Sequence, residues 1–382
     1  MLYLLFHSLL GGQHYAYENA LFRGACAALL CFLGVVLTGP AVIRQLMRFK
    51  LGDRPEFDHA TLNQLAADKK NVPTMGGLLI IAALIVGILL FADPFNFYVQ
   101  MSLVCLLWLG FLGAVDDWMK LTRAESSTTR DGLRFYQKFL FQISLGVVLG
   151  YFIYSHGLNN ANYAFVGPTD ERRSIQAFRV LMVPFYKHGV LLNAAAFMFL
   201  TVLVVAGTSN AVNLTDGLDG LASGCVALCS VVFMILSYVA GTPELAAKLL
   251  IPYVPASAEL AVISGCVMGS AIGFLWYNCH PAKVFMGDTG SLPLGGLIGY
   301  VAIVTRQELM LFLVGGVFVF EALSVILQVG CFKMTGGKRL FLAAPIHHHF
   351  QLSGWTETQT VTRFWLLGAI FAVFALATIK LR

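Results

Sequence analysis

Long apolar segments recur along the whole chain and are separated by short polar stretches. Each approaches the roughly 20 residues that a helix needs to cross the ~30 Å hydrocarbon layer of a bilayer. Backbone groups in hydrocarbon must pair within their own segment, and alternating strand patterns are absent, so each segment is predicted to be a helix. The ten predicted spans are Ala25–Ile43, Met75–Phe91, Met101–Val115, Phe139–Ser155, Val190–Thr208, Leu221–Ala240, Glu259–Leu275, Leu292–Thr305, Leu309–Val329 and Phe364–Ile379.

The Lys and Arg residues indicate how these spans are oriented, because basic loops remain in the cytoplasm. Most of the 25 basic residues fall in the loops after the first, third, fifth, seventh and ninth spans, although four others lie between His156 and Gly189. We therefore expect an all-α polytopic membrane protein with ten transmembrane helices in one domain, residues 1–382, and with both termini on the outer side. The segment Pro243–Pro255 is expected to form a short interfacial helix.

The composition agrees with a chain whose main solvent is lipid. Hydrophobic residues make up 58% and charged residues 12% of the chain, whereas a soluble domain carries about 25% charged residues. The net charge of +5 does not indicate a nucleic-acid partner, because the basic residues flank apolar spans. The eight cysteines lie in or beside the spans without paired metal-ligand spacing, so we expect them to be packing residues.

Five aspartates fall at the ends of apolar spans, all on the side predicted to be cytoplasmic. Carboxylates at membrane depth are costly and normally face a cavity or a partner. Several that converge on one face of the membrane indicate a bound cation, and Mg²⁺ prefers carboxylate oxygens while bridging to substrate phosphates. These residues are Asp116, Asp117, Asp216, Asp219 and Asp288.

Two motifs carry four of these aspartates. In "DDWMK", Lys120 follows Asp117 by three residues, so a carboxylate and an ammonium can share one helix face, which suits phosphate chemistry. The alternative is the polar end of a span with a lysine that reaches the interface. In "NLTDGLDG", Asn213, Asp216 and Asp219 recur at three-residue spacing beside glycines that let a ligand approach the main chain. Here the alternative is a capped helix start.

Two further motifs lie beside the same face. "VFMGDTGS" sets Asp288 between glycines directly before a span, with Asn278 and Lys283 upstream, which suits either a metal ligand or a helix cap. "KKNVPTMGG" offers Lys69 and Thr74 as contacts for an anion or a nucleotide. Basic residues that simply obey the orientation bias are the alternative there.

A run of three histidines, "HHH", follows Pro345 in a loop predicted to be cytoplasmic. His347, His348 and His349 suit phosphate binding, proton transfer or metal binding. A zinc site is disfavoured, because consecutive histidines cannot all reach one ion from a regular helix and no cysteines accompany them. Glu321, within the ninth span, is interpreted as a buried residue that hydrogen-bonds between helices.

Taken in order, "VPTMGG", "DDWMK", "NAVNLTDGLDGLA", "VFMGDTGS" and "APIHHHF" resemble the phospho-N-acetylmuramoyl-pentapeptide transferases over nearly the whole chain. These belong to the polyprenyl-phosphate N-acetylhexosamine-1-phosphate transferases. The resemblance implies a ten-helix, Mg²⁺-dependent enzyme of the bacterial inner membrane, usually a homodimer, with its active site on the cytoplasmic face. Such an enzyme joins the phospho-sugar-pentapeptide of UDP-MurNAc-pentapeptide to undecaprenyl phosphate, forming lipid I and UMP.

The same resemblance assigns roles to the metal and acceptor side of the site. Asp288 is expected to be the principal Mg²⁺ ligand. Asp116 and Asp117 are expected to handle the lipid phosphate, with Asp116 the preferred base, and Lys120 to neutralise phosphate charge. Direct transfer and a covalent intermediate on an aspartate both remain open.

On the donor side, the resemblance places Phe285 against the uracil ring with Lys69 nearby. The candidate substrate-binding residues are Lys69, Thr74, Asn213, Asp216, Asp219, Asn278, Phe285 and His349, and the candidate catalytic histidines are His347 and His348. A sister transferase acting on UDP-N-acetylglucosamine shares the aspartates. An ion-coupled transporter also needs acidic residues in its spans, but it places them near the midplane between repeated halves.

Overall fold

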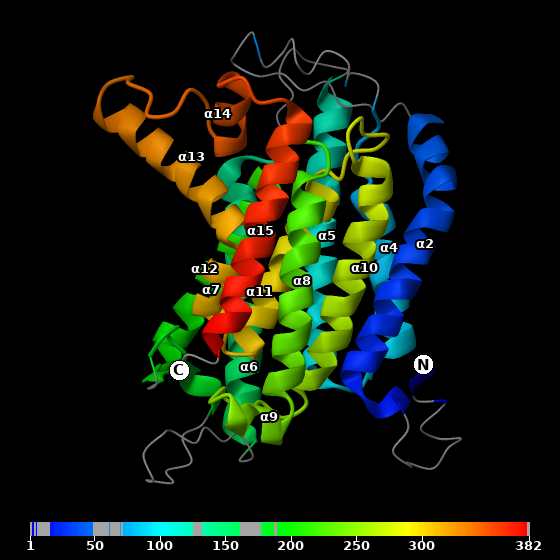
Figure 1. Cartoon of the computed structure of the whole chain (residues 1–382), viewed down its shortest axis with the longest axis vertical. Coiled ribbons are helices and arrows are strands. Elements are labelled where there is room, and N and C mark those ends of the chain that lie inside the picture. The colour runs from blue at the N-terminus through cyan, green and yellow to red at the C-terminus, as the bar shows by residue number, and fades with distance from the viewer. Residues whose placement is uncertain are drawn as a thin grey trace.

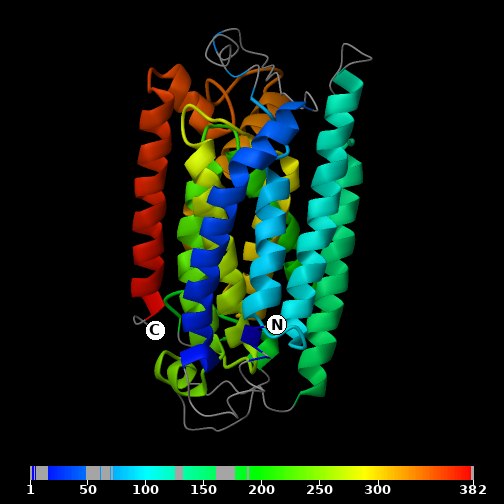
Figure 2. The same ribbon diagram turned by 90° about the vertical axis from the view of Figure 1, so that its right-hand side faces the viewer.

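The structure is a computed structural model that describes residues 2, 3, 5, 16–48, 61, 69, 72–124, 132–160, 177–186 and 189–379. Long helices form one bundle, and both termini lie at the same end of it (Figures 1 and 2). The helices of 15 residues or more are α2 (Ala20–Arg48), α4 (Gly77–Phe91), α5 (Phe97–Ala124), α6 (Phe135–Asn159), α7 (Ala194–Thr215), α8 (Leu221–Ala240), α10 (Leu260–Asn278), α11 (Asp288–Val304), α13 (Gly316–Met334) and α15 (Glu357–Ile379).

Shorter elements connect these helices. They are the helices α9 (Pro243–Lys248), α12 (Glu308–Val314) and α14 (Ile346–Leu352), the 3₁₀ turns η1 (Ala16–Glu18), η3 (Ala177–Arg179) and η4 (Ser257–Glu259), and the strands β1 (Val180–Leu181) and β2 (Val190–Leu191). Helix α9 lies within the segment predicted to form a short helix. It sits at the end of the bundle that carries the termini, whereas α14 lies at the opposite end (Figure 1).

Among the described residues, eight helices are long and apolar enough to cross a membrane. The predicted all-helical polytopic class is therefore confirmed. Two of the ten predicted segments correspond to shorter apolar helices, α4 and α11, of 15 and 17 residues. At 1.5 Å per residue these are about 22–26 Å long, less than the thickness of the hydrocarbon layer. The number of ten spans and the side that the termini face remain predictions.

Two predicted spans have different boundaries or continuity in the structure. The helix predicted from Val190 is wrong at its start, because Val190 and Leu191 pair with β1 in an antiparallel ladder. Helix α7 begins only at Ala194, where the Asn193 side chain accepts a hydrogen bond from the main chain. The ninth predicted span is divided at Gly315 into α12 and α13. Figure 1 shows α13 tilted away from the bundle.

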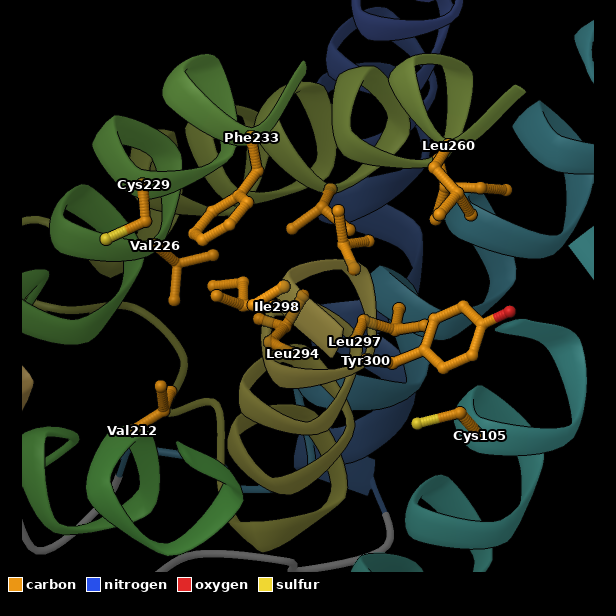
Figure 3. Packing of buried hydrophobic residues seen from close by; sticks show 14 of the residues in the cluster. Cys105, Val212, Val226, Cys229, Phe233, Leu260, Leu294, Leu297, Ile298 and Tyr300 are labelled. Atoms are coloured by element: carbon orange, nitrogen blue, oxygen red, sulfur yellow. The ribbon is translucent and has the colours of Figure 1, made fainter. Parts of the chain in front are cut away.

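Helix α11 forms the centre of the bundle, and every one of its residues is buried. It packs mainly between α5 and α7, and Figure 3 shows Leu294, Leu297, Ile298 and Tyr300 directed into the surrounding helices. Its N-terminal turn lies very close to α5, since a Cβ on Gly113 would come within 2.2 Å of the Asp288 carbonyl oxygen. This close approach brings the first residue of α11 to the aspartate pair of α5.

Candidate active site

Three buried carboxylates meet near the end of the bundle opposite the termini. Asp116 and Asp117 lie on α5, and Asp288 is the first residue of α11. One oxygen of each lies within 4.8 Å of the others, and the three residues are 0%, 4% and 7% exposed. The structure therefore brings together carboxylates that are 171 residues apart in the chain.

Asp117 holds the start of α11. One of its oxygens accepts the Asp288 N–H at 3.1 Å, and the other accepts the Thr289 N–H at 2.9 Å and the Thr289 hydroxyl at 2.7 Å. The first N–H groups of a helix have no partner within the helix, and a negative charge there is favourable. Asp117 is thus a capping residue supplied by another helix, and it fixes the position of Asp288.

Asp116 is the most enclosed of the three aspartates. One oxygen accepts the Leu133 N–H at 2.7 Å, and the other lies 2.7 Å from the ammonium groups of both Lys120 and Lys138. Lys138 also donates to Asp288 at 2.7 Å, and Lys120 lies 3.3 Å from the same oxygen. Two cationic side chains therefore lie between Asp116 and Asp288.

The "NLTDGLDG" motif approaches this group from α7. Asn213 donates its amide to Asp288 at 2.7 Å and to the Ser291 hydroxyl at 2.9 Å. Asp216 ends α7. Burial raises the pKa of the Asp216 carboxyl well above its ordinary value, and the nearby charges of Asp288 and Asp117 raise it further. Asp216 therefore holds a proton more readily than an exposed aspartate does.

Asp219, from the same motif, belongs to a second polar cluster. Its oxygens accept hydrogen bonds from the Lys69 ammonium at 2.6 Å and from the Ala282 N–H at 3.1 Å, and Nδ1 of His280 lies at 3.1 Å. Glu357, at the start of α15, also lies 2.6 Å from Lys69. These partners of the Asp219 carboxylate lie outside the first turn of the following helix, α8, so the capping alternative for Asp219 does not hold.

The segments around Thr74 and Phe285 are joined by main-chain hydrogen bonds. Phe285 donates its N–H to the Pro73 carbonyl at 2.8 Å, and the Phe285 carbonyl accepts the Gly76 N–H at 2.9 Å. Gly287 follows with φ of +70°, and a Cβ there would lie 2.5 Å from an Asp117 oxygen and 3.0 Å from the Thr74 hydroxyl. Only glycine suits this turn, which leads directly into Asp288.

Asn278, the last residue of α10, is buried between the start of α8 and the loop before α11. Its side-chain oxygen accepts hydrogen bonds from the Gly220 N–H at 3.1 Å and the Ser223 hydroxyl at 3.2 Å, and its amide donates to the Val284 carbonyl at 2.9 Å. These bonds tie the turn before α8 to the loop before α11. The predicted contact between Asn278 and substrate remains a prediction.

The first histidine of the run is paired with a glutamate. Nδ1 of His347 lies 3.0 Å from Glu321, and both side chains are completely buried. The predicted location of Glu321, buried between helices, is thus confirmed. The other ring nitrogen faces the "NLTDGLDG" motif, because a Cβ on Gly217 would lie 2.4 Å from it. Helix α14 thereby brings His347 beside the turn that contains Asp216.

The other two histidines have different surroundings. Nδ1 of His348 lies 2.9 Å from the Gln351 side-chain oxygen. Burial, followed by the neighbouring His347, lowers the pKa of His348 to about 3. His348 is therefore neutral near pH 7. His349 accepts the Leu342 N–H at 3.2 Å and has its ring edge-on to Phe341, so it holds the chain that leads into α14.

Sequence reasoning did not identify four residues of these clusters: Lys138, Thr289, His280 and Glu357. In the sequence, Lys138 is one of many basic residues that flank the spans, and Thr289 is one residue of "GDTGS". His280 stands between Asn278 and Lys283, the two residues named upstream of "VFMGDTGS", and this position was a usable signal. Glu357 is 138 residues from Asp219 in the chain, and no local pattern connects the two.

The chain is similar to known proteins over most of its length. Residues 99–306 match the family Glycosyl transferase family 4. The chain is 43% identical over 360 residues to the phospho-N-acetylmuramoyl-pentapeptide-transferase of Desulfotalea psychrophila, covering 94% of this chain and 93% of the relative. It is 39% identical over 385 residues to the protein of the same name in Thermodesulfovibrio yellowstonii, with both chains fully covered. The chain therefore belongs to glycosyl transferase family 4, among the relatives named phospho-N-acetylmuramoyl-pentapeptide-transferase.

Proposed function

We propose that this chain transfers phospho-N-acetylmuramoyl-pentapeptide from UDP-MurNAc-pentapeptide to undecaprenyl phosphate, forming lipid I and UMP. The observation that carries the proposal is the group formed by Asp116, Asp117 and Asp288 with Lys120 and Lys138, which suits two phosphates brought together. Full-length similarity to transferases of that name supports it. Such a reaction must offset repulsion between two anionic phosphates, and clustered cationic charge does so.

The cluster of three carboxylates is also suited to Mg²⁺. Lysine ammonium groups lie 2.7–3.3 Å from Asp116 and Asp288, so a positive charge already lies where a cation would bind. Carboxylate oxygens are the ligands that Mg²⁺ prefers. We assign Asp288 as the principal ligand with Asp116 beside it, because the oxygens of Asp117 hold the main chain of α11, whereas Asp116 and Asp288 each contact lysine ammonium groups that an incoming cation could replace. Bound there, Mg²⁺ would neutralise phosphate charge and polarise the phosphoryl group under attack.

The side chains around the ion would bind and orient the phosphates. Lys120 is the most exposed of the charged groups, with 40% of its side chain accessible, so it can turn from Asp116 to an incoming phosphate. The acceptor phosphate needs little help from a base, because its second pKa is near 6. Asp116 therefore orients the acceptor and takes the remaining proton when one is present.

Direct transfer is favoured over a covalent aspartyl intermediate. Each oxygen of Asp116 already contacts at least one donor, and two ammonium groups bind one of them. Charge pairing of this kind weakens a carboxylate as a nucleophile. Donor incubated without lipid acceptor should give no stoichiometric burst of UMP. A trapped phospho-sugar on the protein would establish the two-step route instead.

The donor would lie across the second cluster and α14. We assign Lys69, Asp219 and Phe285 to the nucleotide, Asn213, Asp216, Thr74 and Asn278 to the walls of the cleft, and His347, His348 and His349 to the donor phosphates and their surroundings. The neutral state of His348 suits hydrogen bonding more than charge pairing. The side chain of His347 is oriented by Glu321.

The positive-inside bias supports an orientation with α14 and the carboxylate group at the cytoplasmic face of the inner membrane and both termini outside. We also propose a homodimer, as the family resemblance implies.

The decisive experiment compares donors. Purified chain in detergent receives undecaprenyl phosphate, Mg²⁺ and either UDP-MurNAc-pentapeptide or UDP-N-acetylglucosamine, and UMP release is measured. Selective use of the first donor supports the proposal. Selective use of the second would instead identify the sister transferase. Uptake of a substrate into proteoliposomes without UMP release would indicate a transporter.

A further inference from the structure

We infer that Glu357 is a positioning residue for the donor nucleotide, which it serves by holding Lys69 and the turn between α7 and α8 in place. The inference rests on the proposed function. Glu357 is the first residue of α15, a helix that otherwise packs against α8, α12, α13 and α14. Its carboxylate reaches a polar cluster built from three other parts of the chain.

The contacts of Glu357 are short and shared. One of its oxygens lies 2.6 Å from the Lys69 ammonium and 2.9 Å from the Asp219 N–H. The same ammonium lies 2.6 Å from the Asp219 carboxylate. The Glu357 and Asp219 side chains are 13% and 3% exposed, and that of Lys69 is 16% exposed. Lys69 is thus held between two carboxylates, and Glu357 also fixes the main chain of one of them.

This arrangement prepares Lys69 for a ligand. A free lysine side chain populates many rotamers, and fixing it when a ligand binds costs conformational entropy. A lysine already fixed by two carboxylates has lost that freedom in the folded protein, so its conformational entropy does not fall again when the ligand binds. Glu357 should therefore act mainly on the affinity for the donor and only weakly on the chemical step.

Glu357 also has an effect that weakens donor binding. Its negative charge repels the diphosphate of the donor, so removing the charge alone would strengthen binding. That repulsion acts over a longer distance and is screened by salt, whereas the ion pair acts at 2.6 Å in a largely buried site. We therefore expect the positioning effect to exceed the repulsion, so loss of the charge should raise the KM for the donor.

The test uses steady-state UMP release from the full chain with Mg²⁺ and both substrates. Glu357→Gln keeps a side-chain oxygen that can accept the Asp219 N–H but loses the charge that holds Lys69. Glu357→Asp keeps the charge on a shorter side chain. The matched control is Glu244→Gln, since Glu244 is an exposed glutamate in the first turn of α9, at the other end of the bundle. Thermal unfolding shows whether each variant is folded.

Glu357→Gln is expected to raise the KM for the UDP donor about tenfold, as loss of one charge-assisted hydrogen bond does. The kcat and the KM for undecaprenyl phosphate should change less than about threefold. Glu357→Asp should recover part of the affinity, and Glu244→Gln should match the wild type. Because Glu357 acts through Lys69, the Lys69→Met, Glu357→Gln double variant should bind donor no more weakly than Lys69→Met alone.

The inference is overturned by an unchanged or lowered donor KM in Glu357→Gln, or by additive losses in the double variant. Equal increases in the KM for both substrates would overturn it too, since they indicate a general structural defect. If Glu357→Gln does not fold, Glu357→Asp tests the contact instead: its shorter side chain lengthens the 2.6 Å contact with Lys69, so the donor KM should rise above the wild-type value, and an unchanged donor KM overturns the inference. A wild-type chain that releases no UMP would refute the proposed function. Weaker binding of UMP itself by Glu357→Gln, measured by calorimetry, tests the positioning role separately.

Discussion

Replacing Asp117 by Asn separates its capping of α11 from any direct role in the chemistry. The carboxylate accepts three hydrogen bonds from the first turn of α11. An asparagine can still accept the two from Thr289 through its oxygen. Its NH₂ group then faces the Asp288 N–H, so two donors oppose each other and one helix N–H loses its partner.

The expected loss of stability follows from these contacts. A hydrogen bond to a charged group contributes about 1.5–3 kcal/mol, and a buried negative charge at a helix N-terminus contributes up to about 2 kcal/mol. Removing a buried charge also relieves its desolvation and its repulsion of Asp116 and Asp288, which acts in the opposite direction. The net destabilisation should be about 1–3 kcal/mol. Asp288 should also shift, and a misplacement of about 1 Å can cost roughly 100-fold in kcat.

Thermal unfolding of the purified protein in detergent and steady-state UMP release measure the two effects. Asp93→Asn is the matched control, because Asp93 accepts the N–H of Phe95 at the far end of the bundle and lies away from α11. Asp117→Asn should lower both the unfolding temperature and kcat. Loss of activity with unchanged unfolding temperature would refute the reasoning, since it would mean that Asp117 acts on substrate and does not position α11.

Two further predictions follow from single residues. Gly287→Ala should destabilise the chain by about 1–3 kcal/mol and reduce activity strongly, because φ is +70° and the new methyl group would lie 2.5 Å from Asp117; an alanine variant with wild-type unfolding temperature would contradict this. His348 has a pKa of about 3, below the ordinary value, so it stays neutral as the pH falls from 9 to about 5. The pH profile of kcat for His348→Gln should therefore have the wild-type shape over that range, and loss of an acid limb in the variant would show that His348 titrates there.

Several features of the fold could be read from the apolar pattern alone. Each of the ten predicted segments overlaps a helix, since hydrocarbon leaves a long apolar segment few alternatives. The ends were less predictable. Helix α5 continues to Ala124, well past the predicted end at Val115. The carboxylates of Asp116 and Asp117 are hydrogen-bonded to other parts of the protein, so the helix does not have to end where these polar residues begin. The predicted start of α7 is wrong because two apolar residues, here Val190 and Leu191, are compatible with a strand as well as with a helix.

The residue types of the site could be predicted from the sequence, but the contacts between these residues could not. The sequence places Asp288 before a span, yet only the packing of α11 against α5 makes Asp117 its cap. Lys138 looks like any basic residue near a membrane surface until α6 is placed, when it reaches Asp116 and Asp288. The contacts of Glu357 could not be predicted from the sequence either, because contacts between distant segments produce no local sequence pattern.

The most direct test is whether the cluster of Asp116, Asp117 and Asp288 binds a divalent metal ion in the absence of substrates. Mn²⁺ replaces Mg²⁺ as a paramagnetic probe, and binding to purified chain is followed by electron paramagnetic resonance. Asp288→Asn should weaken Mn²⁺ binding at least tenfold, since it removes the charge of the principal ligand. Asp219→Asn, which alters a second group of side chains that lie close enough together to hold a metal among the described residues, should leave binding unchanged. Wild-type Mn²⁺ affinity in Asp288→Asn, or loss of binding only in Asp219→Asn, would contradict the account.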